Sequence, residues 1–403
     1  MTARRFCFLL ILSSLLVGAA GAVKAAEPEP GVARISLIHG DVTSKRGDSG
    51  DWVALTVNSP LVRGDTVATG TQSRTEIQLD YANTVRLGDR TEVKLADLTR
   101  TQLQVQVKEG VLNLTVLKGS EAEVEIDTPN VAIRPLKEGR YRVEVVGGET
   151  RVIVRKGEAE ALTPQGSTIV KKGKMITVRG VDDPEYQIAG AADRDNWDRW
   201  NEDRDDAMQD ARSWGYGSRY YTGLHDLDRY GRWVYVSGYD WVWSPYADPY
   251  WAPYRHGRWL WEPYWGWTWV SYEPWGWAPY HYGRWFCHGS AWYWWPGPVH
   301  AYYRPTWAPA YVSFFGFGFG RLHFSFGVGW GYHSLGWVPV GPWDYYHPWH
   351  GRHYNSYHAV NITNITNVTN IRNITNVRNA AAVPPLADRR RPYKSNLQGA
   401  LSD

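Results

Sequence analysis

Three copies of the triplet Gly-Arg-Trp, at residues 231, 257 and 283, place an arginine beside a tryptophan every 26 residues. Another tryptophan stands twelve residues after each glycine. A guanidinium group can stack on an indole face, and exposed indoles can anchor a sugar ring or an extended peptide. These residue types and their spacing therefore indicate a ligand-binding surface. The candidate residues are Arg232, Arg258, Arg284, Trp243, Trp269 and Trp295.

Acid–base catalysis would need paired carboxylates, and few acids occur in the aromatic region. Glu262 and Glu273 could act as an acid/base pair in a groove lined for sugars. Both precede prolines in expected turns, however, and no GxSxG, HExxH, P-loop or dinucleotide motif occurs. We therefore expect a non-catalytic protein that needs no cofactor.

Histidines and aspartates could suggest a metal site. The segment 347–358 holds four histidines, but no cysteine or carboxylate stands at a spacing typical of metal ligands. The aspartates between 182 and 214 lack the glycine and terminal glutamate of a calcium loop. We predict a salt-bridged helix there and no metal site in either segment.

The elements that must position the triplets are β-hairpins. Residues 230–296 hold 15 of the 24 tryptophans, and large side chains alternate along short runs separated by Gly, Ser and Pro. Alternation indicates half-buried strands, and a fixed period indicates repeated units that share one core. We expect one hairpin per unit in an aromatic β-repeat domain, residues 223–350. The glycine of each triplet would allow close backbone approach or a positive φ.

The N-terminus has the order of a secretory signal peptide. Arg4 and Arg5 precede an apolar run from Phe6 to Val17, and small residues follow. We expect residues 1–25 to be removed, which leaves a soluble periplasmic or otherwise extracytoplasmic protein. An uncleaved anchor is the alternative, since Phe6 to Val23 is long enough to span a bilayer.

Residues 26–181 change to short alternating strands without a helical period, which predicts an all-β domain of sandwich, roll or solenoid type. This stretch contains the segments RGDTVATG (63–70), TVRLGDRTEVKL (84–95), KEGVLNLTV (108–116) and RKGEAEAL (155–162). These segments resemble the FecR domain, the periplasmic part of a family of bacterial envelope regulators. The resemblance implies a β-roll or solenoid-type fold and a habit of binding proteins or glycans. Because only five residues precede the apolar run, we expect no cytoplasmic anti-sigma segment.

A charged stretch, 182–222, links the two domains. Trp197, Trp200, Ala207, Met208 and Ala211 fall near helical spacing, which predicts a short connecting helix with a narrow apolar stripe. The following residues HDLDRYGRWVYV (225–236) and GWTWVSYEPWGWAPYHYGRW (266–285) resemble an uncharacterised family in which a FecR-like domain precedes a Trp/Pro/Gly-rich domain. That resemblance implies no activity.

The C-terminal stretch, 351–403, is of low complexity. Residues 361–379 repeat Asn-x-Thr-like triplets, a period that fits neither a strand nor an α-helix. They could form an edge that associates with copies of itself, or a flexible extension. The rest of this stretch has the composition of a disordered tail.

Three functions remain open. The first is a binding module for a cell-wall glycan or an envelope protein, the second a structural scaffold, and the third an envelope signalling component without the anti-sigma part. The net charge of +3, with acids and bases mixed, predicts no nucleic-acid partner.

Overall fold

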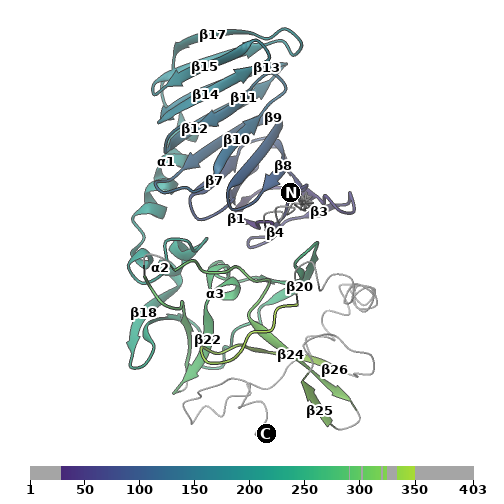
Figure 1. Ribbon diagram of the computed structural model, residues 1–403, viewed down its shortest axis with the longest axis vertical. Coiled ribbons are helices and arrows are strands. Elements are labelled where there is room, and N and C mark those ends of the chain that lie inside the picture. Colours follow the sequence, from purple (N-terminus) through teal and green to yellow (C-terminus); the bar gives the residue numbers. More distant parts are fainter. Residues whose placement is uncertain (1–28, 290, 301–302, 319–320, 325–333, 350–403) are drawn as a thin grey trace, which may run out of the picture.

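The computed structural model describes residues 29–349, apart from 290, 301–302, 319–320 and 325–333. A tall stack of strands forms one end of the molecule, and a domain of hairpins forms the other (Figure 1). No helix among the described residues is long and apolar enough to cross a membrane. The expected signal peptide, 1–25, and the repeat tail, 351–403, lie outside the described residues.

The first layer of the N-terminal domain is an antiparallel sheet. Its strands follow in space as β4 (Pro60–Leu61), β1 (Ala33–His39), β6 (Arg74–Gln78), β7 (Asn83–Leu87), β9 (Gln102–Val116), β12 (Gly139–Val146), β13 (Glu149–Lys156), β16 (Lys174–Arg179) and β17 (Glu185–Gly190).

The second layer is antiparallel except where β10 runs parallel to β9. Its strands follow as β3 (Trp52–Ala54), β2 (Val42–Lys45), β5 (Thr66–Thr69), β8 (Glu92–Leu98), β9, β10 (Glu123–Asp127), β11 (Ala132–Pro135), β14 (Glu158–Thr163) and β15 (Gly166–Lys171).

Strand β9 belongs to both layers. Its residues 102–109 pair with β8 or β10, and residues 110–116 pair with β7 and β12. At the change, Gly110 has a φ of 100°, and a Cβ there would lie 2.3 Å from the Thr91 hydroxyl oxygen. Only glycine fits both constraints.

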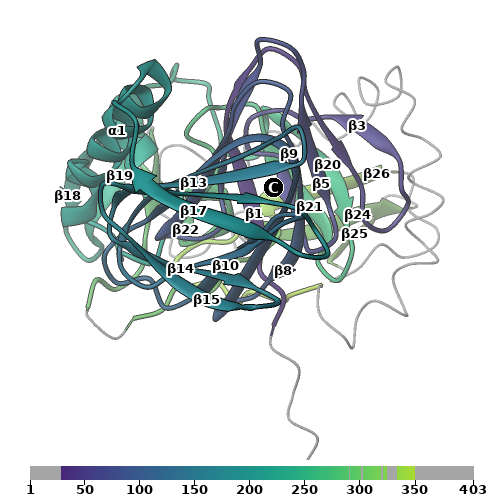
Figure 2. The same ribbon diagram turned by 90° about the horizontal axis from the view of Figure 1, so that it is seen from above.

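Figure 2 shows the two layers from above. Valine, leucine and isoleucine side chains from both layers form one buried core between them. They occupy alternate strand positions, as in β12, where Tyr141, Val143 and Val145 are buried. The predicted mainly β fold is confirmed, as two facing layers of stacked strands.

Helix α1 (Asn196–Gln209) covers the outer face of the first layer, and the chemistry of its buried side differs from the prediction. The residues it buries at helical spacing are Asp198, Asn201, Asp205 and Met208. The predicted apolar stripe is therefore wrong, since Trp197 and Trp200 are only partly buried. The salt-bridged character of the helix is confirmed. A capping box between Asp195 and Asp198 begins it.

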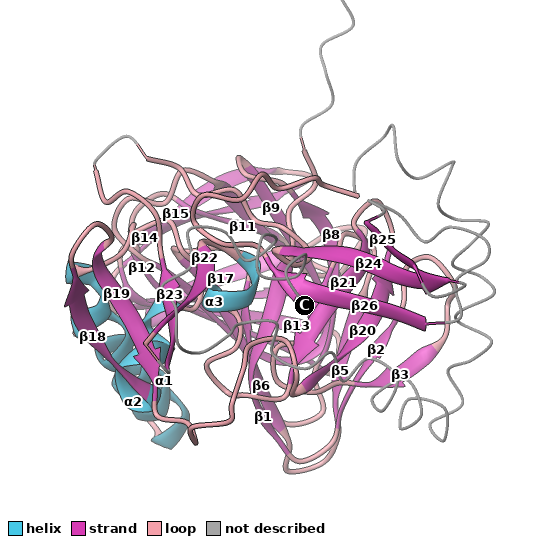
Figure 3. Cartoon of the chain, turned by 90° about the horizontal axis from the view of Figure 1, so that it is seen from below, coloured by secondary structure: helices cyan, strands magenta, loops and turns pink. Residues whose placement is uncertain are grey.

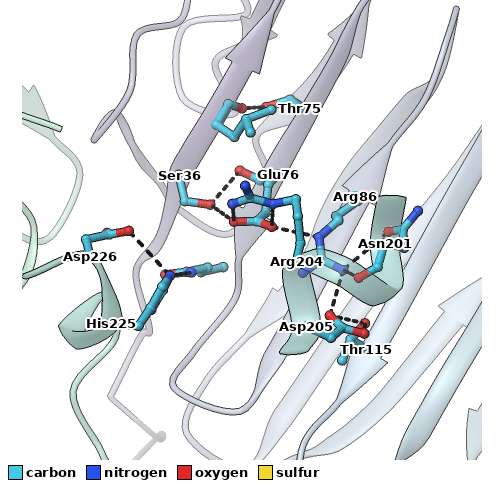
Figure 4. Close-up of polar contacts among 12 residues, drawn as sticks. Ser36, Thr75, Glu76, Arg86, Thr115, Asn201, Arg204, Asp205, His225 and Asp226 are labelled. Atoms are coloured by element: carbon cyan, nitrogen blue, oxygen red, sulfur yellow. Dashed lines mark hydrogen bonds and ion pairs between the residues drawn. The ribbon is translucent and has the colours of Figure 1, made fainter. Parts of the chain in front are cut away.

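The outer face of the first layer carries the partners of these acids (Figure 4). Arg86, fully buried, lies 2.6 Å from the Glu76 carboxylate and 2.7 Å from that of Asp205. Arg204 of α1 donates two hydrogen bonds to Glu76, at 2.6 and 2.7 Å. Burial alone would raise the pKa of Glu76, but Arg86 and Arg204 hold it well below its ordinary value. The helix is thus attached by buried ion pairs.

Short helices η1 (Arg212–Gly215), η2 (Leu224–Asp226) and α2 (Leu227–Tyr230) lead into three hairpins. The hairpins are β18 (Gly231–Val236) with β19 (Asp240–Pro245), β20 (Gly257–Glu262) with β21 (Gly266–Ser271), and β22 (Arg284–His288) with β23 (Ala291–Trp295). Figure 3 shows them from below. Helix α3 (Ala278–His281) precedes the third hairpin. The prediction of one hairpin per 26-residue unit is confirmed.

A three-stranded sheet follows the hairpins, in the order β25 (Arg321–Phe324), β24 (Val312–Gly318) and β26 (Ser334–Pro339). It packs Phe314 and Trp337 against Trp259. The hairpins and this sheet share one core in which Trp and Tyr are the majority. No single hairpin could bury this much aromatic surface, so the units stabilise one another.

Candidate ligand-binding face

Each Gly-Arg-Trp glycine lies beneath the indole of its own hairpin. A Cβ at Gly231 would lie 2.4 Å from Trp243, one at Gly257 2.5 Å from Trp269, and one at Gly283 2.6 Å from Trp294. A larger residue would push the indole out of the core. The predicted close approach at the three glycines is therefore confirmed, and it explains why glycine begins each unit.

The third hairpin has a shorter turn than the other two. Trp233 pairs with Trp243 and Trp259 with Trp269, whereas Trp285 pairs with Trp294 instead of Trp295. One residue less in the turn reverses the direction of every later side chain. Trp294 is therefore buried in the core, and Trp295 points to the opposite face of the sheet.

Two of the six candidate residues have no exposed ring to offer a ligand. Trp243 is fully buried and Trp269 is 1% exposed, and both belong to the aromatic core. Their expected exposure is wrong because the inward face of each hairpin packs on its neighbours. Trp285 is also a core residue, while Trp233 and Trp259 are partly buried against the core.

The three arginines have three different environments. Arg232 is exposed. Arg258 lies 3.5 Å from the Thr56 hydroxyl of the N-terminal domain. The Arg284 guanidinium lies 4.0 Å from the ring centre of Tyr311, a cation–π contact. Only Arg232 remains available to solvent as a polar partner.

Strands β18, β19, β23 and β22 form one sheet whose outer face gathers the remaining candidates. Arg232 lies opposite Ser244, and Arg284 lies opposite Trp295. Because Trp243 pairs with Trp294 across β19 and β23, these residues all point away from the core. We call this surface the outer aromatic face and define it as Arg232, Tyr239, Tyr293, Trp295 and Trp343. Phe286 points to the same side of the sheet but is 1% exposed, because Tyr239 stacks on it.

Trp343 is the most exposed ring of the outer aromatic face, at 64%. It is stacked with Trp295 at 6.5 Å between ring centres and 28° between planes. Tyr239, in the first hairpin's turn, stacks on Phe286 at 4.1 Å and lies 6.3 Å from Trp343. Sequence analysis missed Trp343 because it stands outside the 26-residue repeat. Its position in a Gly-Pro-Trp-Asp turn was the one available signal.

Comparison with known families agrees with both parts of this architecture. Residues 65–160 match the FecR protein family. Residues 224–344, which include all three hairpins and Trp343, match a family of unknown function, DUF6600. The FecR match lies within the N-terminal β domain. No curated protein matches this chain.

Two crystal structures from Parabacteroides distasonis, both assigned to the anti-sigma factors, are similar to this chain. The first is 16% identical with a TM-score of 0.28, and the match covers 31% of this chain and 59% of that one. The second is 17% identical with a TM-score of 0.29, and the match covers 41% and 73%. The chain thus spans 59% of the first of these proteins.

Glu262 and Glu273, the candidate acid/base pair, serve structural roles. Glu262 is fully buried and accepts a hydrogen bond from Arg46 of the FecR domain. Burial raises the pKa of Glu262 to about 8, although Arg46 opposes the shift. Glu273 accepts hydrogen bonds from Tyr280 at 2.6 Å and from Trp251 at 2.6 Å. Neither carboxylate lies on the outer aromatic face.

Buried polar contacts join the FecR domain to the hairpin domain. Arg34, fully buried, forms an ion pair with Asp226, and its side chain also donates to Gln78 at 2.8 Å. The Asn58 amide donates to the carbonyl oxygens of Ser271 and Glu273, at 3.3 and 2.8 Å. We call these contacts, with the Arg46–Glu262 pair, the interdomain joint. They fix the outer aromatic face relative to the FecR domain.

The described residues contain no group of three or more His, Cys, Asp or Glu side chains that could hold a metal ion. Of the four histidines singled out in the sequence, His347 is described, and His350, His353 and His358 lie outside the described residues. Residues 361–379, which we expect to associate with copies of themselves, also lie outside the described residues.

Proposed function

We propose that this protein is a non-catalytic binding protein of the cell envelope that holds a cell-wall glycan on its outer aromatic face. The observation that carries the proposal is the Trp343 ring, 64% exposed and stacked on Trp295, on the face that also exposes Arg232.

A sugar ring has an apolar face and a rim of hydroxyl groups, and this surface complements both. The Trp343 indole offers a flat apolar platform, and Arg232 and the Tyr293 hydroxyl offer hydrogen-bonding groups on the same face of the sheet. Trp343 is supported from below by Trp295, so that little side-chain entropy remains to be lost on binding. Aromatic side chains with these properties dominate the binding energy of many interfaces.

The FecR match supports a second candidate, an envelope signalling component. In that function the outer aromatic face would be the sensing surface, and the interdomain joint would couple it to the FecR domain. Both candidates place the mature protein outside the cytoplasm, as the signal-like N-terminus predicts. The intact mass of protein recovered from the envelope, short by 22 to 26 residues, would support export.

Co-sedimentation with purified peptidoglycan tests the glycan proposal. The mature protein should pellet with the insoluble glycan, and Trp343→Ala should remain mostly in the supernatant. Tyr235→Ala is the matched control, because Tyr235 is 63% exposed but points to the other face of the same sheet. Equal pelleting of Trp343→Ala and the wild type would refute the assignment of the face.

A further inference from the structure

The end of the FecR domain that lies farthest from the hairpins is open. Strand β17 ends the first layer and pairs with β16, and β15 ends the second layer and pairs with β14 (Figure 1). Among the described strands, the registers pair β17 with β16 alone and β15 with β14 alone. Two rows of backbone N–H and C=O groups therefore face solvent at this end.

Strand β17 also presents apolar side chains that the described residues cover only in part. Tyr186 lies opposite Val178, and Ile188 lies opposite Ile176. Val178 and Ile176 are fully buried between the layers, so Tyr186 and Ile188 point into the same space. They are nevertheless 53% and 40% exposed, because β17 is the last strand of its layer. The core thus continues to this end of the domain without a cap.

Soluble proteins protect such edges with charges, prolines or bulges, and β17 contains no proline and no bulge. Its sequence, EYQIAG, contains one charged residue, Glu185. That carboxylate lies opposite Arg179 of the neighbouring strand. The register between β16 and β17 is continuous over all six pairs. An edge strand without a bulge, with two apolar residues and a single charge at one end, can pair with another strand.

We propose that β17 pairs antiparallel with β17 of a second copy of this chain, about a two-fold axis at Gln187. An antiparallel pair keeps side chains of like direction opposite one another. With Gln187 opposite its own copy, Tyr186 lies opposite Ile188 of the second copy, and Ile188 opposite Tyr186. Glu185 lies opposite Ala189, so no like charges meet. In this register each copy of β17 therefore covers Tyr186 and Ile188 of the other copy, and the two strands are complementary.

A two-fold contact at this end closes after two copies and forms a dimer. The hairpin domains lie at the opposite end of each copy (Figure 1). The dimer would therefore be elongated and carry one outer aromatic face at each far end. This pairing is independent of what the outer aromatic face binds.

Cysteine cross-linking of the full mature chain tests the register. Residues directly opposite in an antiparallel pair have Cβ atoms about 4.5–5.5 Å apart, close enough for a disulfide with a small adjustment. Gln187→Cys should therefore form a covalent dimer on mild oxidation. Glu185→Cys is the matched control: its copy lies four residues further along the strand, about 14 Å away. Both variants keep Cys287, which is buried.

Light scattering after size-exclusion chromatography measures the assembly without a cross-link. The wild type should have twice the mass of one chain, and Ile188→Lys, which places a charge in the paired core, should have the mass of one. Tyr235→Lys, on an exposed aromatic of the hairpin domain, should remain a dimer. A wild-type monomer at the highest soluble concentration, or a Glu185→Cys variant that cross-links as fast as Gln187→Cys, would overturn the proposal.

Discussion

In the hairpin domain, single residues determine which side chains are buried in the core and which are exposed to solvent. The Gly-Arg-Trp triplets made the hairpins and their glycines predictable, because close packing under an indole excludes every larger residue. Spacing alone did not predict which side chains point into the core and which point to the outer aromatic face. One residue less in the third turn reverses Trp295, and Trp343 reaches the face from a turn outside the repeat.

Truncating a core side chain should lower the free energy of unfolding much more than truncating a side chain of the outer aromatic face. Trp285→Ala removes an indole that is 1% exposed and donates to the Pro279 carbonyl at 2.8 Å, so we expect a loss of about 3–5 kcal/mol in the free energy of unfolding. Arg232→Ala, at an exposed position, should change it by less than about 0.5 kcal/mol. Denaturant titration measures both. Comparable losses would mean that Arg232 is part of the core.

Glu262 should make stability depend on pH. Its pKa is about 8 in the folded protein and 4.5 ordinarily, so between these values the folded state binds a proton that the unfolded chain has released. Stability should therefore fall as pH rises through this window, by up to about 1.4 kcal/mol per pH unit. Glu262→Gln should flatten the profile, and Glu185→Gln, at an exposed site, should not. Identical slopes for Glu262→Gln and the wild type would contradict the assignment.

At the scale of elements, α1 shows where pattern analysis of a helix misleads. The apolar residues of a helix usually mark its buried face, but here the sheet beneath presents arginines. The partners Glu76 and Arg86 lie more than a hundred residues before the helix, so the sequence gives no local sign that its aspartates are buried. The helix itself and its salt bridges were predictable from charge spacing.

Removing one partner of this network should be costly. Arg86→Met leaves Asp205 buried without its arginine, and we expect a loss of about 3–5 kcal/mol in stability. Arg90→Ala breaks an ion pair in which the arginine side chain is 76% exposed, and should cost at most about 1 kcal/mol. Thermal unfolding followed by circular dichroism compares them. If Arg86→Met is as stable as Arg90→Ala, the helix is held by other contacts.

For the whole molecule, the predicted order of β domain, helix and hairpin domain is confirmed, whereas the interdomain joint was not foreseen. Its members, such as Arg34 and Asp226, are nearly two hundred residues apart, and each alone looks like an ordinary surface charge. The FecR domain nevertheless has its own apolar core, separate from the aromatic core.

This separation predicts how fragments fold. A fragment of residues 27–181 keeps the apolar core but loses β17 and α1, which begin after it. A fragment of residues 27–210 includes both, and with them the partners of Glu76 and Arg86. Both fragments should unfold cooperatively, the longer one at the higher temperature. Calorimetry that finds no transition for residues 27–210 would show that the FecR domain depends on the hairpin domain.

The measurement that tests the central claim most directly is the dissociation constant for soluble peptidoglycan fragments, obtained by calorimetric titration. The wild type should bind, Trp343→Ala should bind at least about tenfold more weakly, a loss of ~1.4 kcal/mol, and Tyr235→Ala should bind as the wild type does. Arg232→Ala should weaken binding without changing stability. Binding that is unchanged in Trp343→Ala, or undetectable in the wild type, would contradict a glycan-binding outer aromatic face.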